Sequence, residues 1–195
     1  MKQKFWSWTG NQLNFKSCIS DASWFEEKTA RQIFFEELKR HSGDVTVLIN
    51  SLGGDYFAAE AIYEMLREYY GHVTVKIENV AASAASVIAM AGAVVEIAHT
   101  GKIFIHNPRF FGYGGEDEDE KREADYMLEE IIESIIDIYE RRTKLSRTQL
   151  SRMMKAETWL SANEAVTLGF ADKIYSNLRR EHHGQTDNHN RRQTC

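Results

Sequence analysis

Apolar positions recur along this chain in two alternating patterns, short strand-like runs and longer segments with helical spacing. Residues 45–49 form a nearly continuous apolar run, which is typical of a buried parallel strand. Residues 73–77 alternate apolar and polar side chains, which predicts a half-buried strand. Further short strands are expected at 13–15, 94–97, 103–105 and 171–175.

Amphipathic helices are expected between these strands. A capping box at 23–26 (Ser-Trp-Phe-Glu) predicts the start of one helix, which the Ser-Gly-Asp at 42–44 ends, and a second helix is expected at 56–70. Their apolar faces consist of Ala30, Ile33, Phe34 and Leu38 in the first helix, and of Ala58, Ala59, Ile62, Tyr63 and Leu66 in the second. The alternation of strands and helices predicts an α/β fold with right-handed crossovers.

The second half of the sequence predicts one long helix. Acidic residues at 116–120 favour a helix N-terminus, and apolar side chains continue at helical spacing towards residue 144. The apolar stripe consists of Leu128, Ile131, Ile132, Ile135, Ile136 and Tyr139. Two interpretations are open: the stripe belongs to the core of the chain, or it packs against a sister subunit.

Helix start and stop signals near the C-terminus predict where the folded part of the chain ends. Capping boxes at Ser146–Gln149 and Ser161–Glu164 predict two short helices, and Gly169 is expected to end the second. From residue 177 the chain is polar and has no apolar pattern, which predicts a disordered tail. We therefore expect one folded domain at residues 1–176 and a tail at residues 177–195.

Composition narrows the classes of partner and location. The chain carries 24 Lys and Arg against 29 Asp and Glu, and no basic stripe interleaved with aromatics, so nucleic acid is not expected as a main partner. The longest apolar stretch, 81–98, is too short and too rich in Ala and Ser to span a membrane, and the N-terminus lacks the apolar run of a signal peptide. Cys18 and Cys195 indicate no disulfide framework. These features together predict a cytoplasmic protein.

Residues 80–92 carry the first candidate for chemistry. Ser83 lies where the strand that begins at Val73 should turn into a helix rich in small residues. A serine at this position is a good N-cap. The same position would also place a nucleophilic hydroxyl beside backbone N–H groups that can stabilise an oxyanion. The residue is therefore either a cap on a tightly packed helix or a nucleophile.

Two strand ends carry further candidates. Gly53 and Gly54 follow the buried strand at 45–49, and paired glycines let backbone N–H groups face a ligand; a plain tight turn is the alternative. His106 follows the strand at 103–105, and Pro108, the only proline, biases Asn107 to extended geometry. Polar residues at strand ends are where α/β folds place their sites, whereas a structural histidine is the alternative for His106.

Four groups of residues, taken in order, resemble the proteolytic subunit of the Clp protease, ClpP. They are Ile49-Asn50-Ser51-Leu52-Gly53-Gly54, Ala82-Ser83-Ala84 with Ala91-Gly92, Ile105-His106-Asn107-Pro108, and Trp159-Leu160-Ser161-Ala162 with Gly169-Phe170-Ala171-Asp172. The resemblance extends from about residue 13 to residue 175. The Ala-Ser-Ala-Ala-Ser at 82–86 and the Glu-Thr-Trp at 157–159 are closer to the phage-encoded branch, the ClpP-like prohead or head-maturation proteases.

The resemblance implies both a fold and an activity. The fold is a ClpP/crotonase-like α/β superhelix of repeated ββα units, with the long helix protruding as a handle. The activity is that of a serine endopeptidase whose nucleophile falls on Ser83, with Ser86 one helical turn away. The family's histidine falls on His106, and its acid, usually Asp, falls on Glu157. Ser83 would attack a peptide carbonyl, His106 would transfer the proton to the leaving amine, and Glu157 would hold the imidazole.

The resemblance also implies the surroundings of this triad. The family's oxyanion donors fall on the backbone N–H groups of Gly54 and Ala84, and residues 108–115 would lie beside the peptide substrate as an added strand. Leu52 replaces the family's usual proline before the glycine pair, and the side chain of Glu157 is one methylene longer than Asp. No metal or organic cofactor is implied, and the sequence has no clustered ligand spacing for a metal.

The partners implied by the resemblance are peptides or unfolded proteins as substrates and further copies of the chain. The handle helix implies a homo-oligomeric ring, or two stacked rings. An AAA+ unfoldase or phage head proteins are the expected heterologous partners.

Two alternative functions come from other classes. Crotonase-like enzymes share the repeated ββα fold and bind acyl-CoA thioesters at a backbone oxyanion hole, but that class needs no Ser–His pair. A non-catalytic ring or scaffold-binding subunit would use Ser83 only as a cap, with the long helix as its functional element. Covalent labelling of Ser83 by a fluorophosphonate distinguishes a serine hydrolase from both.

Overall fold

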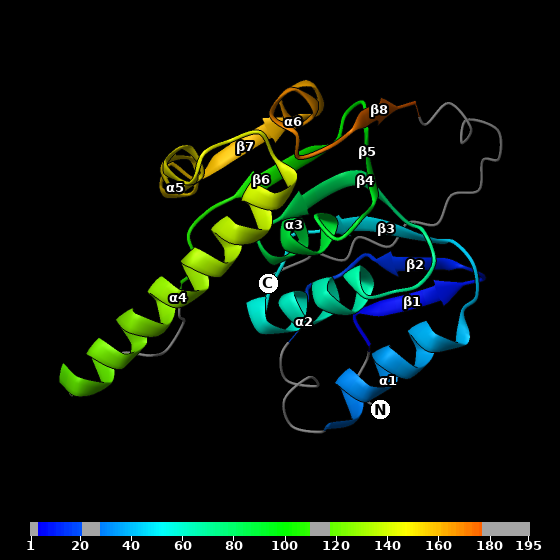
Figure 1. The fold of residues 1–195 in the computed structure, drawn as a ribbon, viewed down its shortest axis with the longest axis horizontal. Coiled ribbons are helices and arrows are strands. Elements are labelled where there is room, and N and C mark those ends of the chain that lie inside the picture. Colours follow the sequence, from blue (N-terminus) through cyan, green and yellow to red (C-terminus); the bar gives the residue numbers. More distant parts are fainter. Residues whose placement is uncertain (1–3, 21–27, 110–117, 177–195) are drawn as a thin grey trace, which may run out of the picture.

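The computed structural model describes residues 4–20, 28–109 and 118–176 (Figure 1). The capping box predicted at 23–26, the Gly-rich segment at 112–115 and the tail from residue 177 lie outside these ranges.

One mixed sheet contains all the strands of the described ranges, in the order β1-β2-β3-β4-β5-β8, with β6 paired to β4 and β7 paired to β6. Pairs β1–β2 and β6–β7 are antiparallel and the others are parallel, which confirms the predicted α/β class. The strands are β1 (Trp6–Thr9), β2 (Gln12–Phe15), β3 (Val45–Ser51), β4 (Val73–Ala82), β5 (Val94–Ala98), β6 (Lys102–Ile105), β7 (Thr158–Ser161) and β8 (Lys173–Tyr175).

Strand β4 is longer than predicted and changes partner along its length. Its first part pairs with β5, and its last three residues, Val80, Ala81 and Ala82, pair with β6. Because β4 and β6 run parallel with Ala82 opposite Phe104, both strands end at the same edge of the sheet. This register brings the residues that follow the two strands together.

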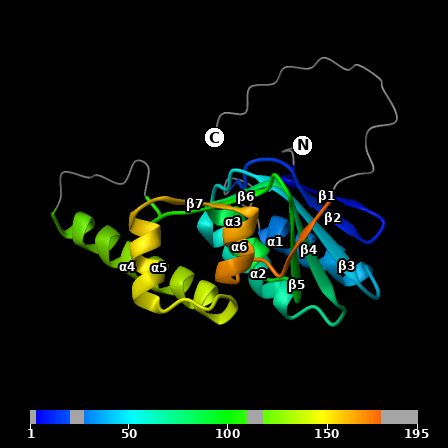
Figure 2. The same ribbon diagram turned by 90° about the horizontal axis from the view of Figure 1, so that it is seen from above.

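Three helices cover one face of the sheet, as the two views in Figures 1 and 2 show. They are α1 (Lys28–Arg40), α2 (Tyr56–Arg67) and α3 (Ala84–Ala89). The predicted apolar face of α2 is buried throughout, and Asp55 caps this helix by accepting a hydrogen bond from the Ala58 N–H at 2.7 Å. The fully buried side chains of β2, β3, β4, α1 and α2 form the main core.

Two predicted details of these helices are wrong. Helix α2 ends at Arg67 instead of residue 70, because Tyr69 and Tyr70 turn back and donate hydrogen bonds from their hydroxyls to the His41 carbonyl, at 3.0 Å each. In α1, Ile33 is 40% exposed although Phe34 and Leu38 are buried. The apolar face of α1 is therefore narrower than its sequence indicates.

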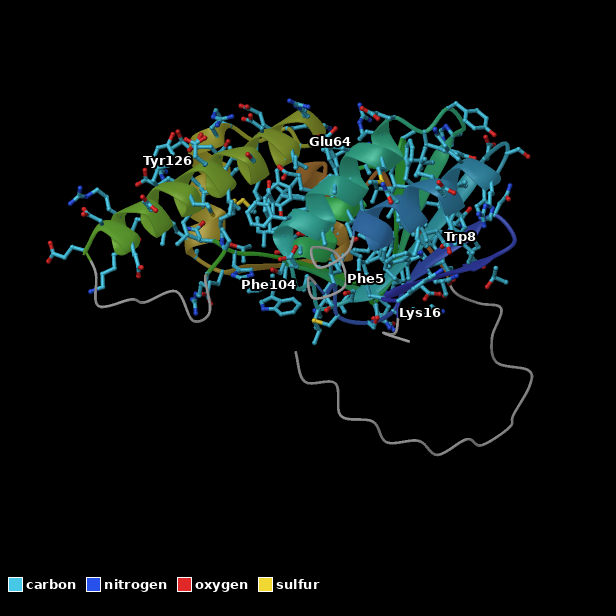
Figure 3. All side chains as sticks on the ribbon, turned by 90° about the horizontal axis from the view of Figure 1, so that it is seen from below. Phe5, Trp8, Lys16, Glu64, Phe104 and Tyr126 are labelled. Atoms are coloured by element: carbon cyan, nitrogen blue, oxygen red, sulfur yellow. The ribbon has the colours of Figure 1, made fainter. Side chains whose placement is uncertain are left out.

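The long helix α4 (Glu118–Arg142) is present and has two unlike halves. Its C-terminal half is part of the core through Ile131, Ile135, Ile136, Ile138 and Tyr139. Its N-terminal half projects beyond the rest of the fold in Figures 1 and 2, and Figure 3 shows Tyr126 on this projecting part. Tyr126 is 66% exposed and Met127 is 49% exposed. The interpretation that the apolar stripe belongs to the core therefore holds only for the C-terminal half of α4.

The two short helices near the C-terminus begin where the sequence predicts, and the second also ends at the predicted residue. Both capping boxes are formed, at the start of α5 (Arg147–Lys155) and of α6 (Ala162–Leu168), and Gly169 ends α6 with a left-handed φ of 91°. Strand β7, between these two helices, was not predicted from the sequence, nor was β1. Among the helices of the described ranges, none has the length and apolar character needed to cross a membrane.

Candidate active site

Ser83 occupies the turn between β4 and α3 in a strained backbone conformation. Its φ and ψ are 53° and −127°, and a non-glycine residue adopts such a positive φ only at an energetic cost. Its N–H donates to the Phe104 carbonyl at 2.9 Å, which fixes the turn to the end of β6. Its side chain makes no capping hydrogen bond, so the alternative of a serine that caps α3 with its hydroxyl is wrong.

The hydroxyl of Ser83 points instead to His106. The distance between Ser83 Oγ and His106 Nε2 is 2.7 Å, a normal hydrogen bond. The imidazole stacks on the ring of Phe104, with centroids 5.1 Å apart, and Phe104 stacks on Trp159 at 4.5 Å. Figure 3 labels Phe104, which lies on β6. Phe104 therefore supports the imidazole beside the serine, and Trp159 packs on Phe104.

The surroundings lower the pKa of His106. Burial is the largest cause, and the positive charge of Arg109 acts in the same direction. The charge of Glu157 and a backbone hydrogen bond at Asn107 oppose these effects without cancelling them. A lowered pKa keeps the imidazole neutral near pH 7, and only a neutral imidazole can accept the proton of the serine hydroxyl.

Glu157 lies near His106 but contacts another residue. Its carboxylate forms an ion pair with the guanidinium of Arg109, and no hydrogen bond joins it to His106 among the described residues. Glu157 also has a positive φ of 51°, at the turn before β7. Arg109 was not predicted from the sequence; the only signal was its place three residues after His106.

The glycine turn packs directly against Ser83. Gly54 pairs with Ile19, because the Ile19 N–H donates to the Gly53 carbonyl at 2.8 Å and the Asp55 N–H donates to the Ile19 carbonyl at 2.9 Å. In such a parallel bridge the middle residue directs its own N–H away from its partner. A Cβ on Gly53 would lie 2.8 Å from Ser83 Cβ, so only glycine permits this approach.

All five residues predicted for the site line one cavity of about 1280 Å³: Gly54, Ser83, Ala84, His106 and Glu157. As the first residue of α3, Ala84 has an N–H without an acceptor inside the helix. The same cavity is also lined by apolar and aromatic side chains from α2, α3 and α4, namely Tyr56, Phe57, Val87, Ile131, Ile135 and Tyr139. Within the described ranges, no three His, Cys, Asp or Glu side chains group so as to hold a metal ion.

Ser86, one turn after Ser83, is fully buried and does not line this cavity. Its hydroxyl lies 2.7 Å from the Tyr139 hydroxyl and donates to the Ser83 carbonyl at 2.5 Å. The cavity therefore presents the hydroxyl of Ser83 and not that of Ser86.

The sequence profile of the family described as Clp protease matches residues 15–178 of this chain. The ATP-dependent Clp protease proteolytic subunit 1 of Chlamydia muridarum is 29% identical over 149 residues, which cover 74% of this chain and 76% of the relative. The ATP-dependent Clp protease proteolytic subunit of Deinococcus radiodurans is 26% identical over 156 residues, which cover 79% of this chain and 76% of the relative.

A solved structure shares the fold. A mutant of ClpP1 from Listeria monocytogenes superimposes with a TM-score of 0.67, covering 86% of this chain and 92% of the other, at 24% sequence identity. At this identity the likeness supports the predicted ClpP-like fold.

Proposed function

Because the chain belongs to the Clp protease family, and this family implies a peptidase, we propose that it hydrolyses peptide bonds by serine catalysis with Ser83 as the nucleophile. The observation that carries this proposal is the 2.7 Å contact between Ser83 Oγ and His106 Nε2. A strained turn that presents a serine hydroxyl to a neutral imidazole is the arrangement that nucleophilic catalysis needs.

The reaction would proceed in two stages. In the first, Ser83 Oγ attacks the peptide carbonyl while His106 Nε2 takes its proton; the C–N bond then breaks and His106 returns the proton to the amine. In the second, water enters in place of the amine and attacks the acyl carbon while His106 takes its proton; the bond from this carbon to Ser83 Oγ then breaks, His106 returns the proton to Ser83 Oγ, and the acyl group leaves as a carboxylic acid. The N–H groups of Gly54 and Ala84 would hold the carbonyl oxygen when it becomes an oxyanion.

Glu157 is proposed as the third member of the triad, acting on His106 through its charge. A carboxylate near the imidazole favours the imidazolium that forms during catalysis, and this is the direction in which Glu157 shifts the pKa of His106. The ion pair with Arg109 competes for the same carboxylate. A direct contact with His106 therefore requires that the exposed Arg109 side chain move away.

The substrate class follows from the wall of the cavity. Apolar side chains from three helices line the same cavity as Ser83, and their burial of an apolar substrate side chain would orient an extended peptide. Peptides and unfolded proteins, whose backbone can enter the cavity in an extended form, are the proposed substrates. The crotonase-like alternative has no comparable support, because the Ser83–His106 pair has no role in it.

The proposed function includes assembly of several copies of the chain. The relatives are named proteolytic subunits of ATP-dependent proteases, which favours an oligomer supplied by an ATP-driven partner. The projecting half of α4, with exposed Tyr126 and Met127, is the proposed contact between copies. Residues 1–176 would form the peptidase domain of each copy. The role in phage head maturation and the cytoplasmic location stay predictions.

Single substitutions test the proposal. Ser83→Ala and His106→Ala should each remove hydrolysis of a fluorescently labelled unfolded protein, whereas the exposed residues Ser42 and His99 provide matched controls as Ser42→Ala and His99→Ala. Hydrolysis by folded, assembled Ser83→Ala at the wild-type rate would overturn the proposal.

A further inference from the structure

A buried pair of hydroxyls connects helix α4 to the backbone of Ser83. Ser86 on α3 is fully buried, and Tyr139 on α4 is 2% exposed. Their hydroxyl oxygens are 2.7 Å apart, and Ser86 Oγ is also 2.5 Å from the Ser83 carbonyl oxygen. Both side chains are buried, so the bonds they make with each other and with Ser83 satisfy their hydroxyls internally.

The direction of these hydrogen bonds follows from the number of protons. The Ser83 carbonyl can only accept, so Ser86 must give it the single proton of its hydroxyl. The Tyr139 hydroxyl must then donate to Ser86 Oγ. Burial raises the pKa of Tyr139, so this phenol keeps its proton at neutral pH. The chain of donors therefore runs one way, from Tyr139 through Ser86 to Ser83.

This chain of donors ends on the carbonyl of Ser83, a residue with a strained backbone. Ser83 has a positive φ, and such strain persists only where the surroundings over-determine the conformation. The Ser83 carbonyl receives both donors of Ser86, the hydroxyl at 2.5 Å and the N–H at 2.9 Å. On the other side of the residue, the Ser83 N–H is held by the Phe104 carbonyl.

We propose that Ser86 and Tyr139 are positioning residues, which hold the Ser83 backbone so that its hydroxyl stays aligned with His106. This inference rests on the proposed function of Ser83 as the nucleophile. The Tyr139 hydroxyl acts on the Ser83 backbone only through Ser86, because it contacts the Ser86 hydroxyl and not the backbone of Ser83, while the Tyr139 ring, which Tyr139→Phe keeps, lines the cavity. The position of α4 is thereby coupled to the alignment of the nucleophile.

Steady-state kinetics of three variants test this order of action. Ser86→Ala should lower kcat for a fluorogenic peptide about tenfold and Tyr139→Phe about threefold, with KM changed by less than about twofold. The double variant should have the kcat of Ser86→Ala, since the Tyr139 hydroxyl has no independent route to Ser83. Tyr69→Phe is the matched control, because it removes a tyrosine hydroxyl that binds the His41 and Gly43 carbonyls away from this site.

Thermal unfolding separates positioning from a merely structural role. Ser86→Ala leaves the buried Tyr139 hydroxyl without its acceptor, so the double variant should be at least as stable as Ser86→Ala. If the hydroxyl pair had only a structural role, kcat would follow thermal stability, and the double variant would have a higher kcat than Ser86→Ala. Equal kcat in the double variant and in Ser86→Ala, despite higher stability, supports positioning.

The outcomes that overturn the inference are distinct from those that overturn the proposed function. Wild-type kcat in Ser86→Ala and in Tyr139→Phe, or effects that multiply in the double variant, would refute positioning while labelling of Ser83 by a fluorophosphonate still supported the nucleophile. Failure of the wild-type protein to be labelled at Ser83 would refute both.

Discussion

Gly54 offers a sharp test of the oxyanion site, because a single methyl group there meets backbone and not a mobile side chain. A Cβ on Gly54 would lie 1.9 Å from the Ile19 carbonyl oxygen, where real Cβ atoms do not come within 3.0 Å. Gly54→Ala therefore forces the turn and the Ile19 segment apart by about 1 Å. The φ of 141° at this position adds backbone strain for any residue other than glycine.

The expected loss of activity follows from this displacement. The Gly54 N–H is proposed to donate to the oxyanion, and removal of one such donor lowers kcat by about 10²- to 10³-fold in other hydrolases. A shift of about 1 Å at a positioning group has a similar effect, about 10²-fold. We therefore expect Gly54→Ala to lower kcat at least about a hundredfold.

The assay is hydrolysis of a fluorogenic peptide by protein shown to be folded by circular dichroism. Gly43→Ala is the matched control, because Gly43 also has a positive φ, 76°, but a Cβ there meets nothing within 4 Å. This control should lose about 1–2 kcal/mol of stability from strain and keep its activity. If folded Gly54→Ala retained kcat within a few-fold of the control, the Gly54 N–H would have no part in catalysis.

Three further predictions concern the histidine, the acid and the long helix. Activity should rise with pH as His106 loses its proton, and the midpoint should lie below the ordinary histidine value because burial and Arg109 lower the pKa of His106. Arg109→Gln should raise this midpoint and Glu157→Gln should lower it. A flat profile of activity from about pH 5 to 8 would contradict the role of His106 as the base. Glu157→Gln should also lower the acylation rate about a hundredfold and Glu157→Asp should retain part of it, whereas near-normal stopped-flow rates would exclude Glu157 from the triad. The sequence pattern alone links Ile136 to assembly, but its side chain is only 2% exposed, so a charge at this position should unfold the chain. Tyr126→Glu, on the projecting half of α4, should leave thermal stability unchanged and block assembly as measured by light scattering. An active monomer would refute the ring.

Local signals in the sequence were sufficient for most elements of the fold. The capping boxes at Ser146 and Ser161 and the left-handed Gly169 depend on neighbouring residues only, and all three are formed as predicted. Strand β7 was missed because its four residues have no alternating pattern and become a strand only by pairing with β6. Strand β1 was missed although its four residues, Trp-Ser-Trp-Thr, alternate apolar and polar side chains and pair with β2 directly after it. For β7, in contrast, the pairing joins segments far apart in the sequence, which a periodic pattern cannot reveal.

In the candidate site too, local sequence signals identify single residues but not the contacts between them. Ser83 and His106 could be singled out because each follows a predicted strand, but their contact depends on the register that sets Ala82 opposite Phe104. The positive φ of Ser83 has no signal in the sequence, since serine normally avoids this region.

Two contacts of the site could not be predicted for the same reason. The Arg109–Glu157 ion pair joins residues 48 positions apart, and the Ser86–Tyr139 hydrogen bond joins residues 53 positions apart. Both depend on how α4 and the segment before β7 pack on the sheet. A charged residue and a tyrosine in an apolar stripe carry no local sign of such a role.

The central claim is that Ser83 is a nucleophile activated by His106, and covalent labelling tests it most directly. The assembled wild-type protein is incubated with a fluorophosphonate, and the modified residue is located by peptide mass spectrometry. The structure predicts one adduct per chain, on Ser83, which disappears in Ser83→Ala and forms far more slowly in His106→Ala. An adduct on Ser86, or labelling that persists in Ser83→Ala, would contradict it.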